Sequence, residues 1–200
     1  MTFRQTIRRA MQQQRRQLPL VIRQQASLSI SRFIATSSWF QRSRHIAFYW
    51  PVRGEIDPLP LLQRAWSMGK TCYLPLCHPL GQQSLLFMPH HPGELLVLNR
   101  YGIFESPIKN LSLARKPYAL DVVFTPLVAF DDQKNRLGSG KGYYDKTFAY
   151  LNQRRMIHKP TLVGLAYQFQ QCSEISAELW DVALDKVVVY DIEYQGVRDI

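Results

Sequence analysis

Short apolar runs that alternate with helical segments constrain the fold of this chain more than any other feature of its sequence. The runs are rich in β-branched or aromatic residues and bounded by turn residues, which predicts strands at 46–50, 71–76, 121–130, 161–167 and 186–190. Helical periodicity and helix-start residues predict helices at 3–17, at 21–40, from the Asp57-Pro58 pair to Gly69, and at 143–151. The segment 75–92 contains prolines, histidines and glutamines and is expected to be a loop.

Strands that are joined by helices pair in parallel, and the helices cover both faces of the sheet. The alternation therefore predicts a Rossmann-like α/β fold of three layers, α/β/α, with a central, mostly parallel sheet and the N-terminal helices packed on it. A length of 200 residues fits a single domain over residues 1–200. The stretch 122–130 is apolar but is interrupted by Thr125 and Pro126, and it is far shorter than the ~20 residues of a membrane helix. No membrane partner is expected.

The cysteines and the first residues of the chain bear on its location. The three cysteines, Cys72, Cys77 and Cys172, are odd in number and form no CxxC pair, which is typical of free thiols in a reducing compartment. The start of the chain lacks the apolar segment of a secretory signal. We therefore expect a cytoplasmic protein, and we expect it to be a monomer.

The positive charge of the chain is concentrated at its N-terminus. The formal net charge is +10, yet the 156 residues after position 44 hold 16 basic and 15 acidic groups. Residues 1–44 contain no acid and no lysine, but they contain nine arginines: Arg4, Arg8, Arg9, Arg15, Arg16, Arg23, Arg32, Arg42 and Arg44. This composition allows a mitochondrial transit peptide, a nucleic-acid-binding arm or a folded helix.

Helical periodicity favours the third of these alternatives. Phe3, Ile7 and Met11 recur at helical spacing, followed by Leu18, and place an apolar stripe on one side of the segment. Arginines and glutamines are expected on the other faces. The alternative of an α/β protein that binds nucleic acid through an Arg-rich arm stays open at this point, although such an arm usually mixes lysine with arginine.

A glycine-rich loop, residues 136–142, lies between a predicted strand and a predicted helix. Its glycines, at positions 138, 140 and 142, let backbone N–H groups approach an anion, and Arg136 and Lys141 add full positive charges. The loop lacks the Walker A pattern, which would need glycine at Asn135 and serine or threonine at Gly142. A glycine-rich turn without a ligand is therefore an equally good interpretation of the loop alone. Asp145 follows one turn into the helix, where a carboxylate would repel phosphate unless Mg²⁺ lay between them.

At this point the sequence resembles a known family. The run 136–145, preceded by 125–131, resembles the motif of the 5-formyltetrahydrofolate cyclo-ligase family, and weaker matches extend the resemblance over nearly the whole chain. They lie in family order at Arg4 and Arg8, 49–57, 69–75, 99–107 and 178–181. The resemblance implies an ATP- and Mg²⁺-dependent ligase that phosphorylates the formyl oxygen of 5-formyltetrahydrofolate and closes the ring to 5,10-methenyltetrahydrofolate. ADP and phosphate would be the other products.

The resemblance also implies roles for individual residues. Arg136 and Lys141 would be catalytic. ATP would be bound by Arg4, Arg8, Arg136, Leu137, Gly138, Ser139, Gly140, Lys141, Gly142, Tyr143 and Tyr144. The folate, with or without a polyglutamate tail, would be bound by Trp50, Glu55, Tyr101 and Tyr143. Mg²⁺ would be held by Asp145 and Asp181, and no nucleic acid is expected as a partner.

Overall fold

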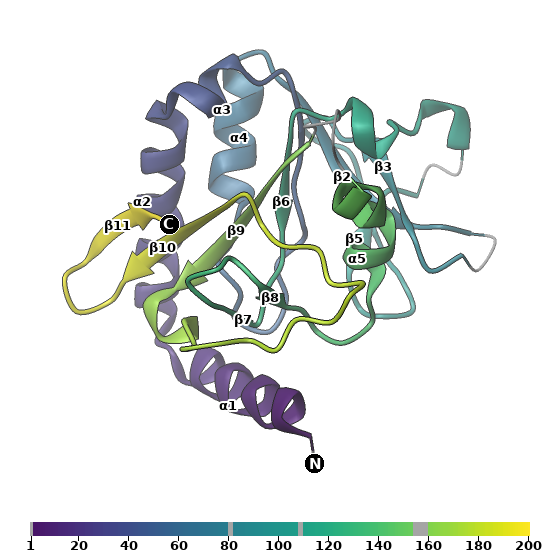
Figure 1. Cartoon of the computed structure of the whole chain (residues 1–200). Helices are drawn as coiled ribbons and strands as arrows, with labels where there is room; N and C mark the ends of the chain where they lie inside the picture. Colours follow the sequence, from purple (N-terminus) through teal and green to yellow (C-terminus); the bar gives the residue numbers. More distant parts are fainter. Residues whose placement is uncertain (1, 80–81, 108–109, 154–159) are drawn as a thin grey trace.

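A seven-stranded sheet runs through the centre of the structure, a computed structural model that describes residues 2–79, 82–107, 110–153 and 160–200 (Figure 1). The strands follow the order β11–β10–β9–β6–β1–β2–β3. Their bounds are β1 (His45–Ala47), β2 (Thr71–Cys77), β3 (Leu85–Pro89), β6 (Val122–Thr125), β9 (Thr161–Tyr167), β10 (Lys186–Asp191) and β11 (Gly196–Asp199). The five central strands are parallel, whereas β3 and β11 pair antiparallel at the two edges. The predicted α/β fold with a mostly parallel sheet is confirmed.

The order of the parallel strands creates a crevice at one edge of the sheet. From β1 the chain moves to its neighbour β2, and the next parallel strand, β6, is added on the opposite side of β1. Numbered in chain order, the five parallel strands follow 2-1-3-4-5, the arrangement of flavodoxin-like folds. Ligands in such sheets bind beyond the carboxyl ends of the strands, where the order reverses. Here that place lies between the ends of β1 and β6.

Helices cover both faces of the sheet. The helices and short 3₁₀ turns are α1 (Phe3–Gln17), α2 (Leu20–Thr36), α3 (Ser38–Arg42), α4 (Leu59–Ser67), η1 (Leu111–Leu113), η2 (Pro117–Ala119), α5 (Tyr143–Phe148), η3 (Ala149–Gln153) and η4 (Gln168–Gln170). Helices α2 and α4 share one core cluster with Val188 and Tyr190 of β10. The other face packs on α5 and η3, where Val187 and Val189 of the same strand join Phe148. Alternation along β10 thus separates the two core layers.

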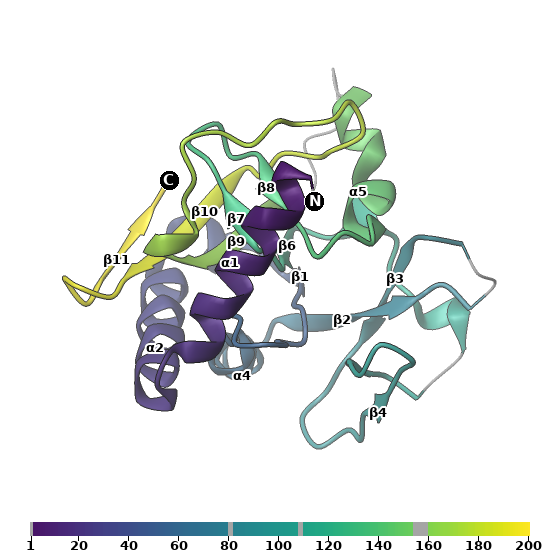
Figure 2. The same cartoon turned by 90° about the horizontal axis from the view of Figure 1, so that it is seen from below.

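Helix α1 crosses the carboxyl edge of the sheet (Figure 2). Ile7 and Met11 pack against a small cluster that includes Leu137 of the hairpin formed by β7 (Ala129–Phe130) and β8 (Arg136–Leu137). Phe3, which was expected on the same apolar stripe, is 67% exposed, because it lies in the first turn, beyond this cluster. The arginine-rich segment is therefore a folded helix held against the body of the protein.

Two expectations about the strands are wrong, and one strand was missed. The stretch 121–130 is not one strand: β6 ends at Thr125, directly before Pro126, and β7 belongs to the separate hairpin. The segment 75–92 is not all loop, because β3 pairs antiparallel with β2. Pro75 lies inside β2 beyond the last residue paired with β1, a position near a sheet edge that tolerates proline. Strand β11 was not predicted.

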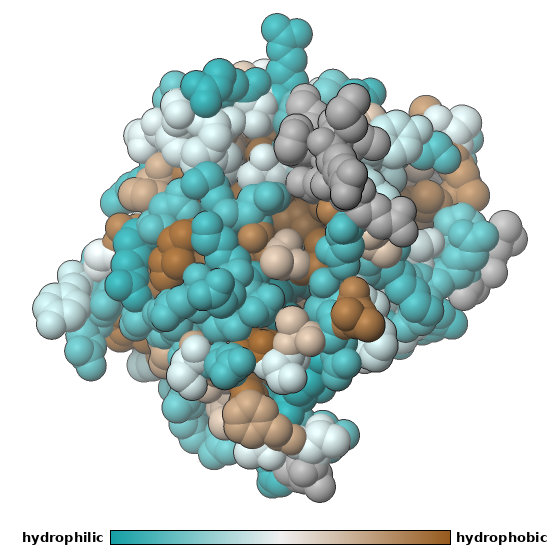
Figure 3. Space-filling model, in the orientation of Figure 1, coloured by the Kyte–Doolittle hydropathy of each residue, from teal (hydrophilic) through white to brown (hydrophobic). Residues whose placement is uncertain are grey.

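Two further expectations concern the surface and the cysteines. The face seen in Figure 3 is mainly hydrophilic, and its hydrophobic residues form small, separate areas. Cys72, Cys77 and Cys172 are all free, as expected. In the described ranges, no helix has both the length and the apolar character that a membrane span requires.

Candidate functional site

A cavity of about 690 Å³ opens at the predicted crevice, beyond the carboxyl ends of β1 and β6. The chain leaving β1 lines it with Tyr49 and Trp50, and the chain leaving β6 lines it with Pro126, Leu127 and Val128. This volume is within the range of sites for small molecules and cofactors. Two ends of different chemistry, a cationic end and an aromatic–carboxylate end, can be distinguished within it.

The glycine-rich loop forms the cationic end. The β7–β8 hairpin presents Arg136, and the loop then turns through Gly140 and Gly142, whose φ values of +99° and +66° favour glycine. Arg136 is only 5% exposed, and its Nη2 donates to Oδ1 of Asp145 at 2.5 Å. No described residue accepts a hydrogen bond from its Nε. A buried guanidinium with a free donor is suited to an anionic ligand.

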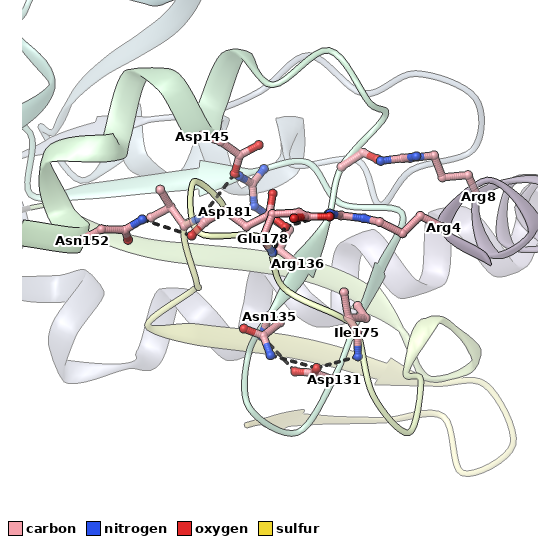
Figure 4. A network of polar contacts seen from close by, with 12 residues as sticks. Arg4, Arg8, Asp131, Asn135, Arg136, Asp145, Asn152, Ile175, Glu178 and Asp181 are labelled. Atoms are coloured by element: carbon pink, nitrogen blue, oxygen red, sulfur yellow. Dashed lines mark hydrogen bonds and ion pairs between the residues drawn. The ribbon is translucent and has the colours of Figure 1, made fainter. Parts of the chain in front are cut away.

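Helix α1 brings two more arginines to this end (Figure 4). Nη2 of Arg4 lies 2.7 Å from Oδ2 of Asp181, and Nε of Arg8 donates to the carbonyl of Gly138 at 2.9 Å. Burial, and next the charge of Arg4, lower the pKa of Arg8 from its ordinary value, while Asp181 acts in the opposite direction. Neighbouring cations that disfavour each other would be stabilised by an anion bound between them.

Lys141 is an exposed cation at the tip of the loop. Its Nζ lies 3.3 Å from the ring centroid of Tyr101, whose hydroxyl is 2.8 Å from that of Tyr143. The Gln83 side chain donates to the backbone carbonyl of Lys141. The backbone of the loop is thus held in place, while the ammonium group contacts an aromatic face. A phosphate ligand carries a full negative charge and would attract the ammonium group away from the ring.

The aromatic–carboxylate end contains a buried acid. The side chain of Glu55 is 9% exposed, and its Oε2 accepts a hydrogen bond from the Val52 backbone N–H at 3.1 Å. Burial raises the pKa of Glu55 from 4.5 to about 7, although Arg15, the Val52 N–H and Arg53 oppose this rise. Trp50 lies nearby in the lining, with its ring 5.1 Å from that of Phe104. A flat ligand could stack here and present N–H groups to the carboxylate.

Sequence reasoning missed Arg15. It was expected on a polar face of its helix, but it is 1% exposed and lines the cavity below Glu55. Its Nη1 donates to the carbonyl of Leu127 at 3.0 Å and lies 3.6 Å from Oε1 of Glu55. One sequence feature could have indicated this position, because residue 15 continues the four-residue spacing of Ile7 and Met11.

The structure brings almost all of the predicted site residues together. Those that line the cavity are Arg4, Arg8, Trp50, Glu55, Tyr101, Arg136, Gly138, Ser139, Gly140, Lys141, Gly142, Tyr143, Tyr144, Asp145 and Asp181. Leu137 is the exception, since it is fully buried beside Ala129 and Ile175. Successive residues of a strand point to opposite sides, so Arg136 faces the cavity and Leu137 faces the core.

The two predicted Mg²⁺ ligands lie at the cationic end, each paired with an arginine. Asp145 pairs with Arg136 and Asp181 with Arg4. The described part of the chain contains no cluster of three or more histidine, cysteine, aspartate or glutamate side chains that could hold a metal ion. This donor set does not fit a cation held by protein alone. It does fit Mg²⁺, which is commonly held by one or two carboxylates together with substrate phosphates and water.

Comparisons with known proteins agree on one family. The sequence model of the 5-formyltetrahydrofolate cyclo-ligase family matches residues 1–190. A 5-formyltetrahydrofolate cyclo-ligase of Haemophilus influenzae is 37% identical over 93% of this chain and 97% of its own length. The 5-formyltetrahydrofolate cyclo-ligase of Escherichia coli K12 is 40% identical over 72% of this chain and 76% of its own length. The solved structure of an Aquifex aeolicus 5,10-methenyltetrahydrofolate synthetase matches with a TM-score of 0.79 at 26% identity, covering 98% of this chain and 92% of the other.

Proposed function

This chain belongs to the 5-formyltetrahydrofolate cyclo-ligase family of enzymes, and we propose that it converts 5-formyltetrahydrofolate to 5,10-methenyltetrahydrofolate at the expense of ATP, with release of ADP and phosphate. One observation carries the proposal. A single cavity combines a cationic, glycine-rich end with an end that pairs aromatic rings and a buried carboxylate. The first suits a triphosphate and the second suits a pterin, so both substrates can meet in one space.

At the cationic end, ATP would be bound by Arg4, Arg8, Arg136, Lys141 and the amides of the glycine loop. The free Nε donor of Arg136 and the two neighbouring arginines of α1 support this assignment. Lys141 would leave the Tyr101 ring to contact the terminal phosphate. Because phosphoryl transfer depends mainly on alignment and neutralised charge, these side chains need do no covalent chemistry.

The proposed reaction has two steps. The oxygen of the formyl group, whose carbon is bonded to N5, attacks the γ-phosphorus of ATP. The bond between that phosphorus and the β,γ-bridging oxygen breaks, and ADP leaves. N10 then attacks the formyl carbon, the carbon–oxygen bond breaks, and phosphate leaves as N10 loses its proton. An amide-like oxygen is a weak nucleophile, so holding it in line with the phosphorus supplies much of the rate enhancement.

At the other end, Glu55 and the aromatic rings would orient the pterin. Trp50 would pack against the flat ring, and the Glu55 carboxylate would accept hydrogen bonds from its N–H groups. Tyr101 and Tyr143, whose hydroxyls are 2.8 Å apart, also line the cavity and would contact the folate, and Tyr143 would contact ATP as well. A pKa of about 7 means that Glu55 is only partly ionised near neutral pH.

Asp145 and Asp181 would hold Mg²⁺ together with the phosphates. The ion would supply positive charge where negative charge develops on the transferred phosphoryl group. Each carboxylate already neutralises an arginine, so metal binding would release Arg136 and Arg4 towards the phosphates. The protein would thus exchange one set of ion pairs for another when ATP and the metal bind.

Contacts of the N-terminal arginines favour a folded helix over a nucleic-acid-binding arm. Arg15 is buried, and Arg4 and Arg8 contact the cavity wall, so three of the nine arginines are engaged within the molecule. The three free cysteines support the proposed cytoplasmic location. The predicted monomer stays a prediction.

A direct assay tests the proposed function. The protein is mixed with 5-formyltetrahydrofolate, ATP and Mg²⁺, and the ultraviolet absorbance of the methenyl product is followed. We expect product only when ATP is present, with one ADP released per methenyl group. The control is the same mixture with a non-hydrolysable ATP analogue in place of ATP. Absence of an ATP-dependent signal would reject the proposal.

A further inference from the structure

Arg15 has no role in the reaction proposed above, although it is the most deeply buried cation at the aromatic–carboxylate end. It is 1% exposed, and among the described residues none accepts a hydrogen bond from its Nε. Burying a guanidinium is costly unless it is paired. Its partners are the Leu127 carbonyl at 3.0 Å and Glu55, whose Oε1 lies 3.6 Å from Nη1. Such a costly placement calls for an explanation beyond helix packing.

We propose that Arg15 is the positioning residue of Glu55: it fixes the carboxylate in the cavity wall and favours its ionised form, which can accept hydrogen bonds from N–H groups of the substrate. The inference deepens the proposed function and rests on it for the identity of the substrate. Arg15 itself acts through Glu55 and is assigned no contact with the pterin.

Contacts around Glu55 support the positioning role. Its two carboxylate oxygens have separate neighbours, since Oε2 accepts from the Val52 N–H and Oε1 faces Arg15. The turn that carries Glu55 lies directly on α1, because a Cβ on Gly54 would be 2.8 Å from the backbone oxygen of Arg15. The bond to the Leu127 carbonyl joins the same arginine to the segment between β6 and β7. Arg15 therefore links three elements at the point where the carboxylate is held.

The charges around Glu55 support the effect of Arg15 on its ionisation. Arg15 of α1 and Arg53 of the same turn favour the ionised form, and of the two only Arg15 is buried, where solvent screens its charge less. Tyr49 after β1 and Tyr144 of α5 also face this carboxylate: burial first, and the Glu55 charge in addition, raise the pKa of each. Asp57 lies in the same electrostatic neighbourhood, near Tyr49. Without Arg15, burial would favour a protonated Glu55.

The test follows the Glu55 carboxyl group itself. Protein labelled with ¹³C at its glutamate side-chain carboxyls is titrated by NMR without substrate, and Glu55→Gln identifies the resonance by its loss. Arg15→Met is expected to raise the Glu55 pKa by about one to three pH units, and Arg15→Lys, which keeps the charge, by less. The matched control, Arg16→Met, changes the exposed neighbour on the same helix and should leave the titration unchanged.

Kinetics provide the second readout. Arg15→Met should raise the KM for 5-formyltetrahydrofolate more than that for ATP and should move the acid limb of kcat/KM for the folate to higher pH. An unchanged Glu55 titration in Arg15→Met would overturn the proposal, as would lost activity with an unmoved pH profile, because both indicate a merely structural arginine. If Arg15→Met does not fold, the titration of Arg15→Lys decides. Since the NMR titration needs no substrate, absent turnover in the unchanged protein would reject the proposed function alone.

Discussion

Lys141 is the residue whose replacement most directly tests the cationic end of the cavity. Its ammonium group is exposed and has the Tyr101 ring as a resting place, so alanine should leave the fold intact. Loss of a full charge at the phosphates should lower kcat about 100- to 1,000-fold, the usual cost of removing one group that stabilises a transition state. Steady-state kinetics with ATP varied measure this. Lys146→Ala, on α5 but outside the cavity lining, is the control, and equal activity of the two variants would contradict the loop assignment.

Asp145 pairs with Arg136 and is a proposed ligand of Mg²⁺, and replacement by asparagine can separate these two roles. Asparagine keeps an acceptor oxygen for Arg136 and Val182 but removes the charge that would hold Mg²⁺. We expect a higher Mg²⁺ concentration for half-maximal activity, and a loss of stability of about 1 to 3 kcal/mol, because a buried guanidinium loses its counter-charge. Magnesium titration of activity and urea unfolding measure the two effects. Asp132→Asn, at an exposed acid outside the cavity, should show neither, and an unaltered Mg²⁺ requirement in Asp145→Asn would refute the metal assignment.

Glu55 should make the stability of the protein depend on pH. Its pKa is about 7 in the folded protein against an ordinary value of 4.5, so the folded state binds the proton more tightly than the unfolded state does. The resulting stabilisation is complete below pH ~4.5 and is lost as the pH rises through about 7, a change of about 3 kcal/mol. Glu55→Gln should flatten the slope of unfolding free energy against pH in this window. Identical slopes in the two proteins would contradict the raised pKa.

Most of the residues that the sequence predicted for the site do line one cavity, and the two departures, Arg15 and Leu137, have physical reasons. The glycine loop, Lys141 and Asp145 form a contiguous motif, so their proximity needs no knowledge of the fold. Arg15 was missed because a charged residue on an amphipathic helix usually faces water, and its tertiary contacts with Glu55 and the Leu127 carbonyl cannot be read from the sequence. Leu137 was included because the motif gives no indication of the strand alternation that turns it into the core.

At the scale of elements, the contact between α1 and the turn before Glu55 is the most sensitive junction. Gly54 has φ +77°, and an added Cβ would lie 2.8 Å from the Arg15 oxygen, so Gly54→Ala combines backbone strain with a clash. We expect a loss of about 2 to 5 kcal/mol, measured by urea unfolding. Gly69→Ala is the matched control, because Gly69 has φ +70° but nothing within 4 Å of its added Cβ. Equal losses at the two positions would show that α1 does not press on the turn.

Elements with strong local patterns were predicted and those defined by pairing were not. Strands β9 and β10 are continuous apolar runs, and Asp57 does cap the start of α4 by accepting from the Leu59 N–H at 2.8 Å. Strand β3 was taken as loop because the prolines and polar residues of the segment 75–92 surround a short apolar run, which is stabilised by pairing with β2. Strand β11, likewise, exists through its pairing with β10.

For the whole molecule, the position of the site follows from topology. The α/β class could be predicted from the alternation of elements, but the strand order could not, because it depends on which side of β1 each later strand joins the sheet. That order puts the ends of β1 and β6 beside each other, and α1 crosses this edge (Figure 2). From α1, Arg4 and Arg8 contact Asp181 and Gly138 at the cationic end, and Arg15 lies beside Glu55 at the other end. One helix therefore contributes to both proposed substrate sites.

In the proposed reaction, the cavity aligns the formyl oxygen of the folate with the terminal phosphate of ATP. The most direct measurement uses 5-formyltetrahydrofolate labelled with ¹⁸O in the formyl group, together with ATP and Mg²⁺, and analyses the released phosphate by mass spectrometry. Because the formyl oxygen becomes a phosphate oxygen in the proposed reaction, one ¹⁸O atom should appear in each phosphate released. Methenyl product formed with unlabelled phosphate would contradict the account.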